Sequence, residues 1–244
     1  ILEGDDLWPP YKLEKQLPLF KDEEIILAWG RTALVHENLI PVIGTESVSA
    51  RYFSLSTIQL LKELLLVDFI PAVTVILRKD AILSVGGFQQ VSYLPTVDYP
   101  TWLALSLKGK FIGSGDIMGY WRRRGGQITA VRAHDIWQGA SRLACEFYLR
   151  LPENIKNNLG INLVFIRAFY NRGYASYSFN TGRRYLIKKN WVKARSEFFN
   201  AFYRGGFFLK LKAVLGLLGS WGRFDLEGVA IIMGKKKIRV LSGK

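Results

Sequence analysis

Three carboxylates stand close together at the start of the chain, in the stretch ILEGDDLW. Glu3, Asp5 and Asp6 lie within four positions of one another, between apolar Leu2 and Leu7. Neighbouring carboxylates repel each other, so a local feature is needed to stabilise them. One interpretation is an acidic turn in solvent ahead of a helix, where negative charge is favoured. The other is a divalent cation, which prefers carboxylate oxygens as ligands.

Three later stretches also combine residue types that chemistry uses. They are TVILRKDAILSVGGF (74–88), VDYPTWL (97–103) and YWRRRGGQIT (120–129). Each has an ordinary structural interpretation when it is taken alone: a glycine turn, a helix cap at Asp98 and a solvated basic run. These stretches therefore indicate a functional site only if the fold brings them together.

The segments that must position these residues alternate between apolar strands and helices, which predicts the α/β class. We expect strands at 25–29, 72–77, 110–112 and 118–122, a loop over 30–50, and a strand end at 1–3. We expect helices at 11–20, 57–66, 81–85 (with Asp80 as N-cap) and 100–107.

From Val131 onward the hydrophobic pattern is helical, with helices expected at 134–149, 162–179, 183–188 and 191–203. One segment, at about 175–208, has the spacing of a tetratricopeptide helix hairpin. Since one copy cannot bury its own apolar face, we expect this hairpin to pack on neighbouring helices. The residues that carry the spacing are Gly182, Tyr185, Ala194, Phe198 and Ala201.

The net charge of +14 lies entirely in the later part of the chain of 244 residues. Residues 1–150 contain 16 basic and 16 acidic side chains, whereas residues 151–244 contain 18 and 4. This asymmetry predicts an anionic partner for the later part, either a membrane surface or a nucleic acid, or else a solvated basic face without a partner. The apolar and lysine positions of 207–218 suit a helix that lies in a membrane interface.

The single cysteine, Cys145, excludes an internal disulfide and favours a reducing compartment. Cys145 lies in an apolar helical pattern, which indicates a packed side chain. His36 and His134 are interpreted as ordinary surface or helix residues. No apolar run reaches the roughly 20 residues that a membrane span needs.

Taken together, the four stretches resemble the later half of the catalytic domain of family 2 glycosyltransferases, in their order and in their spacing. The resemblance covers about residues 1–135. It implies a partial GT-A fold there, followed by a basic helical extension over 136–244. In that family the nucleotide-binding strands and helices precede the acidic motif, so we expect the chain to be the later part of a longer protein.

The resemblance implies an inverting glycosyltransferase that moves a sugar from a nucleotide-diphosphate donor to a hydroxyl of a saccharide or lipid-linked acceptor. Surface polysaccharide or glycolipid synthesis on the cytoplasmic face of a membrane would be its setting. It implies that Asp5, Asp6 and Glu3 hold Mg²⁺ or Mn²⁺, and that Asp98 is the general base. The other implied residues are Arg122, Arg124 and Gln127 for the donor diphosphate, and Gly86, Gly87, Phe88 and Trp102 for the acceptor.

Two positions depart from the family pattern. Val97 stands where the family has a second carboxylate beside the base, and Arg124 stands where it often has a histidine. The alternative to an enzyme is a non-catalytic basic helical module on an incomplete α/β scaffold, binding an anionic membrane or a nucleic acid. No nucleic acid is expected, because no nucleic-acid motif is visible and the basic excess avoids the α/β part.

Overall fold

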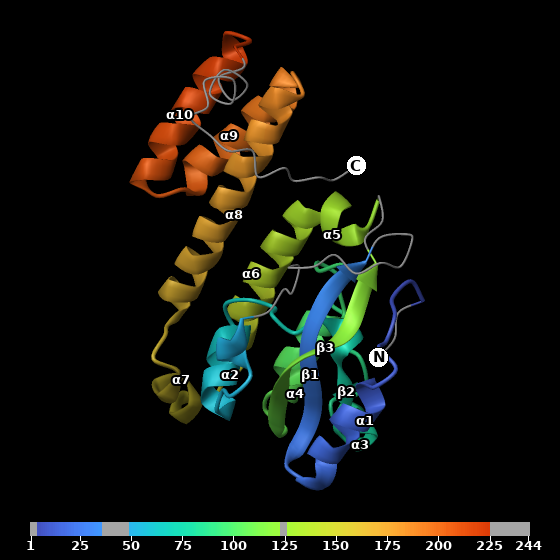
Figure 1. The fold of residues 1–244 in the computed structure, drawn as a ribbon. Coiled ribbons are helices and arrows are strands. Elements are labelled where there is room, and N and C mark those ends of the chain that lie inside the picture. The colour runs from blue at the N-terminus through green and yellow to red at the C-terminus, as the bar shows by residue number, and fades with distance from the viewer. Residues whose placement is uncertain (1–3, 36–48, 123–125, 225–244) are drawn as a thin grey trace. The chain divides into compact units, whose positions relative to one another are not determined.

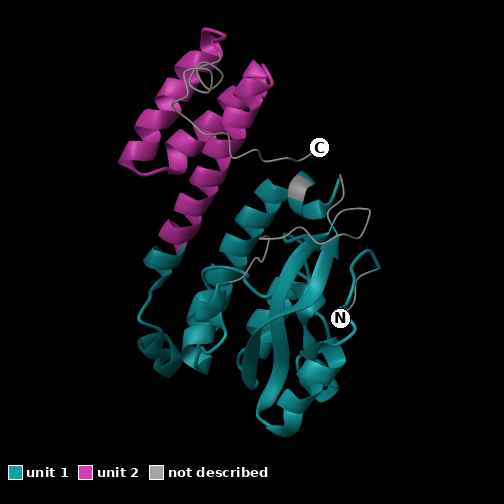
Figure 2. Ribbon diagram, in the orientation of Figure 1, with its two compact units in different colours: residues 1–166 teal, residues 167–244 magenta. Residues whose placement is uncertain are grey.

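The computed structural model describes residues 4–35, 49–122 and 126–224. The chain divides into two compact units, 1–166 and 167–244 (Figure 2). The first unit contains the sheet and is of the α/β class, and the second is helical. The strand end predicted at 1–3, and with it Glu3, His36 and Arg124, lies outside the described residues.

Within the described residues, the sheet of the first unit has three strands in the order β2-β1-β3 (Figure 1). The strands are β1 (Ile25–Val35), β2 (Ile76–Leu77) and β3 (Lys110–Arg122), with β1 parallel to β3 and antiparallel to β2. Leu27, Ala28 and Trp29 in the central strand are at most 1% exposed. A continuous apolar run of this kind is typical of a strand that is buried on both faces.

The prediction of a loop over 30–50 is wrong for residues 30–35, and β3 is one strand where two were expected. Glycines explain both errors. A Cβ on Gly30 would lie 2.5 Å from the Met118 Cγ, and one on Gly113 would lie 2.7 Å from a Phe53 ring carbon. Glycine is therefore required for close packing inside these strands, whereas in a sequence it suggests a break.

The strand predicted at 72–77 is wrong in its first half, which forms the 3₁₀ helix η3 (Ala72–Thr74). The Thr74 N–H and hydroxyl both donate to the Pro71 carbonyl, at 3.0 and 2.8 Å. The Thr74 carbonyl accepts from the buried Lys12 Nζ (2.5 Å) and Gln16 Nε2 (3.0 Å). These bonds, within the turn and from α1, use the groups that a strand ladder would need.

The cap predicted at Asp80 is also wrong. Helix α3 (Lys79–Ser84) begins before Asp80, so Asp80 lies in the first turn and Arg78 takes the N-cap position. The Arg78 guanidinium points elsewhere and donates to the Ile25 and Phe20 carbonyls, at 2.9 and 2.6 Å.

Short helices flank the sheet in the first unit. The helix predicted over 11–20 is divided between an α-helix and a 3₁₀ helix, because Pro18 has no N–H to continue the helical bonds. The Ser56 hydroxyl and the Gln59 side chain form a capping box at the start of α2, which fixes where that helix begins. The elements are α1 (Lys12–Gln16), η1 (Leu17–Lys21), η2 (Ala50–Tyr52), α2 (Thr57–Leu64), α4 (Asp98–Leu105), α5 (Ile128–Val131), α6 (Ala133–Arg150) and α7 (Glu153–Leu159).

The second unit consists of most of α8 (Leu163–Ile187), with α9 (Trp191–Arg204) and α10 (Phe207–Trp221). The helices predicted at 162–179 and 183–188 are one helix, in which Gly182 faces the Phe198 ring. Leu186, Ala194, Phe198 and Leu217 form its buried core. By compactness residues 136–166 belong with the first unit, and the boundary expected after residue 135 stays a prediction. None of the helices in the described part of the chain is both long and apolar enough to cross a membrane.

Candidate functional site

A cavity of about 510 Å³ opens towards the carboxyl ends of β1 and β3. Side chains from separate parts of the sequence line it, including three carboxylates. Ligands of open α/β sheets bind beyond the carboxyl ends of the strands, so this cavity lies where a substrate site is expected. Its lining includes Asp6, Thr32, Asp68, Asp98, Trp121 and Thr129.

Asp6 is held in place by the end of β3. Leu7 and Tyr120 exchange backbone hydrogen bonds of 3.1 and 2.9 Å, which pairs the N-terminal segment with this strand. The Arg122 N–H donates to the Asp6 carboxylate at 3.0 Å, and the Asp6 residue is only 8% exposed. The acidic stretch is therefore a fixed part of the cavity wall.

Burial raises the pKa of Asp6 above its usual value, and the charge of Asp5 raises it further. The hydrogen bond from the Arg122 N–H, and the Arg122 charge, oppose this rise. The described residues contain no group of three side chains that could hold a metal ion. Mg²⁺ commonly binds to one or two carboxylates together with substrate phosphates. Asp6 lines the cavity, whereas its neighbour Asp5 is not among the lining residues.

Asp98 is the first residue of α4 and lines the same cavity. Its carboxylate accepts the Tyr99 N–H at 2.9 Å. The Tyr99 hydroxyl donates to the Leu64 carbonyl at 2.7 Å, which fixes the start of α4 against the end of α2. Pro100 suits this first turn, where a missing N–H leaves no intrahelical bond unmade. Asp98 is half-buried and so can be reached from the cavity.

Asp68, in the loop after α2, was missed at the sequence level. Asp68 lines the cavity, and the residue as a whole is exposed. Desolvation of its carboxyl group raises the pKa of Asp68 well above its usual range, and repulsion from Asp98 adds to the effect, whereas a hydrogen bond from the Ile70 backbone opposes it. In the sequence, Asp68 could have been noticed as an acidic residue between an apolar helix and Pro71.

Arg122 and Gln127 lie beside the acidic stretch. The Gln127 side-chain amide donates to the Arg122 carbonyl at 2.8 Å, so it supports the turn after β3. The Arg122 Nε is buried and has no hydrogen-bond partner in the described part of the chain. A buried N–H without a partner calls for an explanation, and Arg122 is not among the residues that line the cavity.

The residues predicted to contact the acceptor are not brought to this cavity. Trp102 is completely buried in α4 and packs in the core. Gly86 and Gly87 have φ of 82° and 89°, which only glycine adopts easily, and Phe88 is 51% exposed beside them. This turn is connected to α4 through Gln89, whose N–H donates to the hydroxyl of Thr101 at 2.9 Å.

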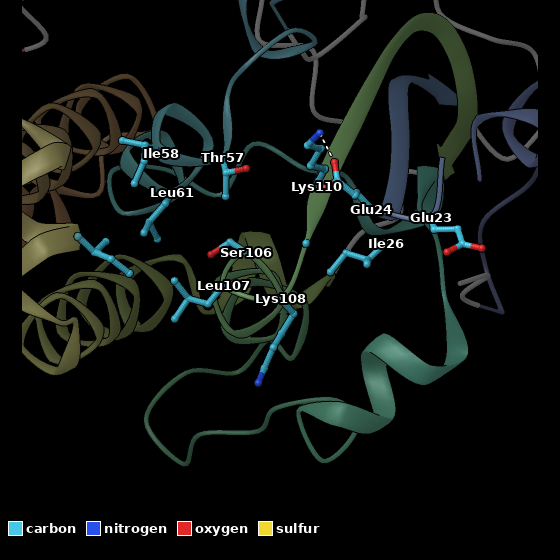
Figure 3. A pocket seen from close by; sticks show the side chains of 12 residues that line it. Glu23, Glu24, Ile26, Thr57, Ile58, Leu61, Ser106, Leu107, Lys108 and Lys110 are labelled. Atoms are coloured by element: carbon cyan, nitrogen blue, oxygen red, sulfur yellow. Dashed lines mark ion pairs between the residues drawn. The ribbon is translucent and has the colours of Figure 1, made fainter. Parts of the chain in front are cut away.

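A second cavity of about 430 Å³ lies at the opposite, amino-terminal ends of β1 and β3 (Figure 3). Glu24 and Lys110 form an ion pair at its edge. Apolar side chains such as Ile58, Leu61 and Leu107 line much of the rest. No residue of the four predicted stretches lines it, so it is not the candidate site.

No protein-family model matches the chain, and no curated protein matches it either. Function must therefore be inferred from the cavity. It combines a buried carboxylate fixed by the backbone, a carboxylate at a helix start and a third carboxylate with a raised pKa. Such a set can bind a cation and move a proton.

Proposed function

We propose that the protein is a glycosyltransferase of the family 2 type, with part of a GT-A domain, which transfers a sugar with inversion to a hydroxyl acceptor. One observation carries the proposal: Asp6 and Asp98, from stretches far apart in the sequence, line one cavity together with Trp121 and Thr129. These are members of the acidic, base and closing stretches of the resemblance. The carboxyl edge of the sheet is also where a nucleotide ligand would lie.

In this proposal Asp98 accepts the proton of the acceptor hydroxyl. The hydroxyl oxygen attacks the anomeric carbon as the bond to the nucleoside diphosphate breaks on the opposite side, so the configuration inverts. A carboxylate is a suitable base because the hydroxyl becomes acidic only as the new bond forms. The Tyr99 N–H holds the Asp98 carboxylate in position, and the start of α4 favours its negative charge.

Asp5 and Asp6 would hold Mg²⁺ or Mn²⁺ at the donor diphosphate. When bound, the cation neutralises charge on the leaving diphosphate. The Arg122 N–H holds the Asp6 carboxylate in its place in the cavity wall. The buried Arg122 Nε is a suitable donor to a phosphate oxygen.

Asp68 would replace the carboxylate that is missing at Val97. Two nearby carboxyl groups tend to separate their roles, since ionisation of one opposes ionisation of the other. With its raised pKa, Asp68 keeps its proton to higher pH than an ordinary aspartate does. In its neutral form Asp68 can donate a hydrogen bond to the acceptor.

The test is sugar transfer by the full-length protein, measured as nucleoside diphosphate released from a panel of UDP- and GDP-sugars with Mn²⁺. Asp98→Asn keeps the hydrogen bond to Tyr99 but cannot take a proton, so we expect the rate to fall by roughly 10²–10⁴-fold. Asp116→Asn, which removes an exposed ion pair with Lys15, is the matched control. Normal transfer by Asp98→Asn would make the base assignment wrong, and no release from any donor would reject the function.

A further inference from the structure

Helix α10 of the second unit is buried along one side only. Ala213, Leu217 and Ser220 are at most 5% exposed. They follow one another at three- and four-residue steps, which places them on one face of a helix. Gly216 lies on the same side, where a Cβ would come within 2.6 Å of the Phe198 ring. This face packs closely against α9, so the rest of α10 is left to face outwards.

The outward side of α10 is apolar. Five of its side chains repeat at four- and three-residue steps, and two more fill the neighbouring row, so together they form one continuous surface along the helix. We call this surface the α10 apolar arc. Its members, with their exposed fractions, are Phe207 (71%), Phe208 (77%), Leu211 (53%), Val214 (37%), Leu215 (59%), Leu218 (57%) and Trp221 (55%).

The arc continues onto α9 and has lysines along its sides. The rings of Phe199, which is 51% exposed, and Trp221 lie 6.0 Å apart edge to face. With about 3.6 residues per turn, Lys210 and Lys212 fall on opposite edges of the arc. The Lys210 Nζ lies 5.7 Å from the Phe202 ring centre, at one of these edges. Exposed apolar area between two basic edges is typical of helices that lie in a membrane interface.

The charge of the second unit suits the same partner. Residues 167–224 contain twelve lysines and arginines, and none of them is buried. The acidic residue in this range, Glu197, is 8% exposed. The exposed charged side chains in the described part of the unit are therefore almost all basic, which favours an anionic partner.

We propose that the α10 apolar arc inserts into the surface of an anionic lipid bilayer, with α10 lying in the plane of the interface. The acyl region takes up the phenylalanines, leucines and Trp221, while Lys210 and Lys212 meet lipid phosphates. This inference goes beyond the proposed transfer reaction and does not depend on it.

Two other partners fit less well. A second copy of the chain would bring two basic surfaces together, and each would repel the other. A nucleic acid would pair with the lysines and arginines, but its phosphate backbone would leave the leucines and Val214 in water. A lipid surface offers both an apolar layer and a negative one, which neither of these two partners does.

The test is binding of the full chain to vesicles of phosphatidylcholine, alone or mixed with phosphatidylglycerol, in a flotation assay. We expect binding to the anionic vesicles, and at least a tenfold loss of it in Leu211→Ser/Leu215→Ser. The control is Leu13→Ser/Leu17→Ser, in which both leucines are similarly exposed (46% and 56%) but belong to the first unit. Circular dichroism of each variant checks that it is folded.

Charge is tested separately with Lys210→Glu/Lys212→Glu. Since a basic side chain near such a surface contributes roughly fivefold to binding, we expect this pair to weaken it at least about tenfold. Lys79→Glu/Lys108→Glu changes the net charge equally, but in the first unit, and should bind far better. An equal loss in both pairs would mean a general charge effect and would overturn the proposal.

Trp221 reports insertion directly. On binding, the tryptophan emission should shift to shorter wavelength, and Trp221→Phe should lose most of that shift. Unchanged vesicle binding by the arc variants would overturn the proposal. So would arc variants that only alter the oligomeric state in sedimentation, or that only lose binding to duplex DNA, because either result assigns the arc to another partner.

Discussion

The backbone N–H of Arg122 donates a 3.0 Å hydrogen bond to the Asp6 carboxylate, which joins the end of β3 to the N-terminal segment. Asp6→Ala leaves this N–H without its acceptor in a site that is only 8% exposed. We expect the free energy of unfolding to fall by about 1–3 kcal/mol. Asp6→Asn keeps an acceptor oxygen, so its free energy of unfolding should fall by less. Denaturant unfolding measures both, and equal losses would mean that the bond does not stabilise the segment.

The acidic pair should also bind a divalent cation when a nucleotide is present. Mn²⁺ added with UDP or GDP is expected to raise the melting temperature of the full-length protein, because a ligand that binds only the folded state stabilises it. Asp5→Asn/Asp6→Asn should abolish the rise. Asp116→Asn, on the exposed part of β3, should keep it. A rise that persists in the double variant would place the cation elsewhere.

Asp68 should make stability depend on pH. A carboxyl group whose pKa is raised on folding binds its proton more tightly in the folded state, so stability falls as pH rises from the unfolded pKa, near 3.8, towards the folded one. Asp68→Asn removes that fall. The free energy of unfolding of this variant, relative to that of the natural chain, should therefore grow as pH rises through this range. One proton contributes at most about 1.4 kcal/mol per pH unit, and because solvent reaches Asp68 the growth should stay well below that limit. A constant difference would show that Asp68 titrates normally.

The sequence predicted those parts of the fold that depend on local pattern. Helices α2, α6 and α9 lie close to their predicted bounds, because their periodicity is strong and Ser56 and Asn190 cap two of them. The strands were predicted less well, because Gly30 and Gly113 are required by the side chains that pack against them and do not mark breaks. Such contacts come from distant residues, and a local pattern does not contain them.

The candidate site was predictable to a similar degree. Asp6 and Asp98 belong to recognisable stretches, and both line the cavity of about 510 Å³. Asp68 has no motif around it, and only the fold shows that it faces Asp98. Trp102 also belongs to a recognisable stretch, but it is completely buried and packs in the core.

Lys12 should give the chain a second dependence on pH. Its side chain is 1% exposed, and burial lowers its pKa to about 7, with only the neutral partners Gln16 and the Thr74 carbonyl as hydrogen-bond acceptors. Between pH 7 and 10 the unfolded state holds a proton that the folded state has lost, so stability should rise by up to about 1.4 kcal/mol per pH unit. Lys12→Met should remove this rise. Lys15→Met, on the same helix but exposed, should retain it.

The last prediction concerns the packing that turns the α10 apolar arc outwards. In Gly216→Ala the new Cβ would lie 2.6–2.7 Å from three carbons of the Phe198 ring, which is completely buried and has little room to move. We expect a loss of about 1–3 kcal/mol in stability, measured by hydrogen exchange of the α9 and α10 amides. Gly206→Ala, where a Cβ meets nothing within 4 Å, is the control and should lose less than about 1 kcal/mol.

A second substitution separates the overlap between a Cβ at position 216 and the Phe198 ring from any other effect of Gly216→Ala on stability. Phe198→Leu removes ring atoms that the new Cβ would meet, so Gly216→Ala should cost less in that background than alone. The coupling between the two positions, measured as a double-mutant cycle, should reach about 0.5–3 kcal/mol. If the two effects simply add, α10 does not pack on Phe198 through Gly216. The apolar residues could not then be assigned to the outward face, and the membrane surface proposed for them would lose its geometric basis.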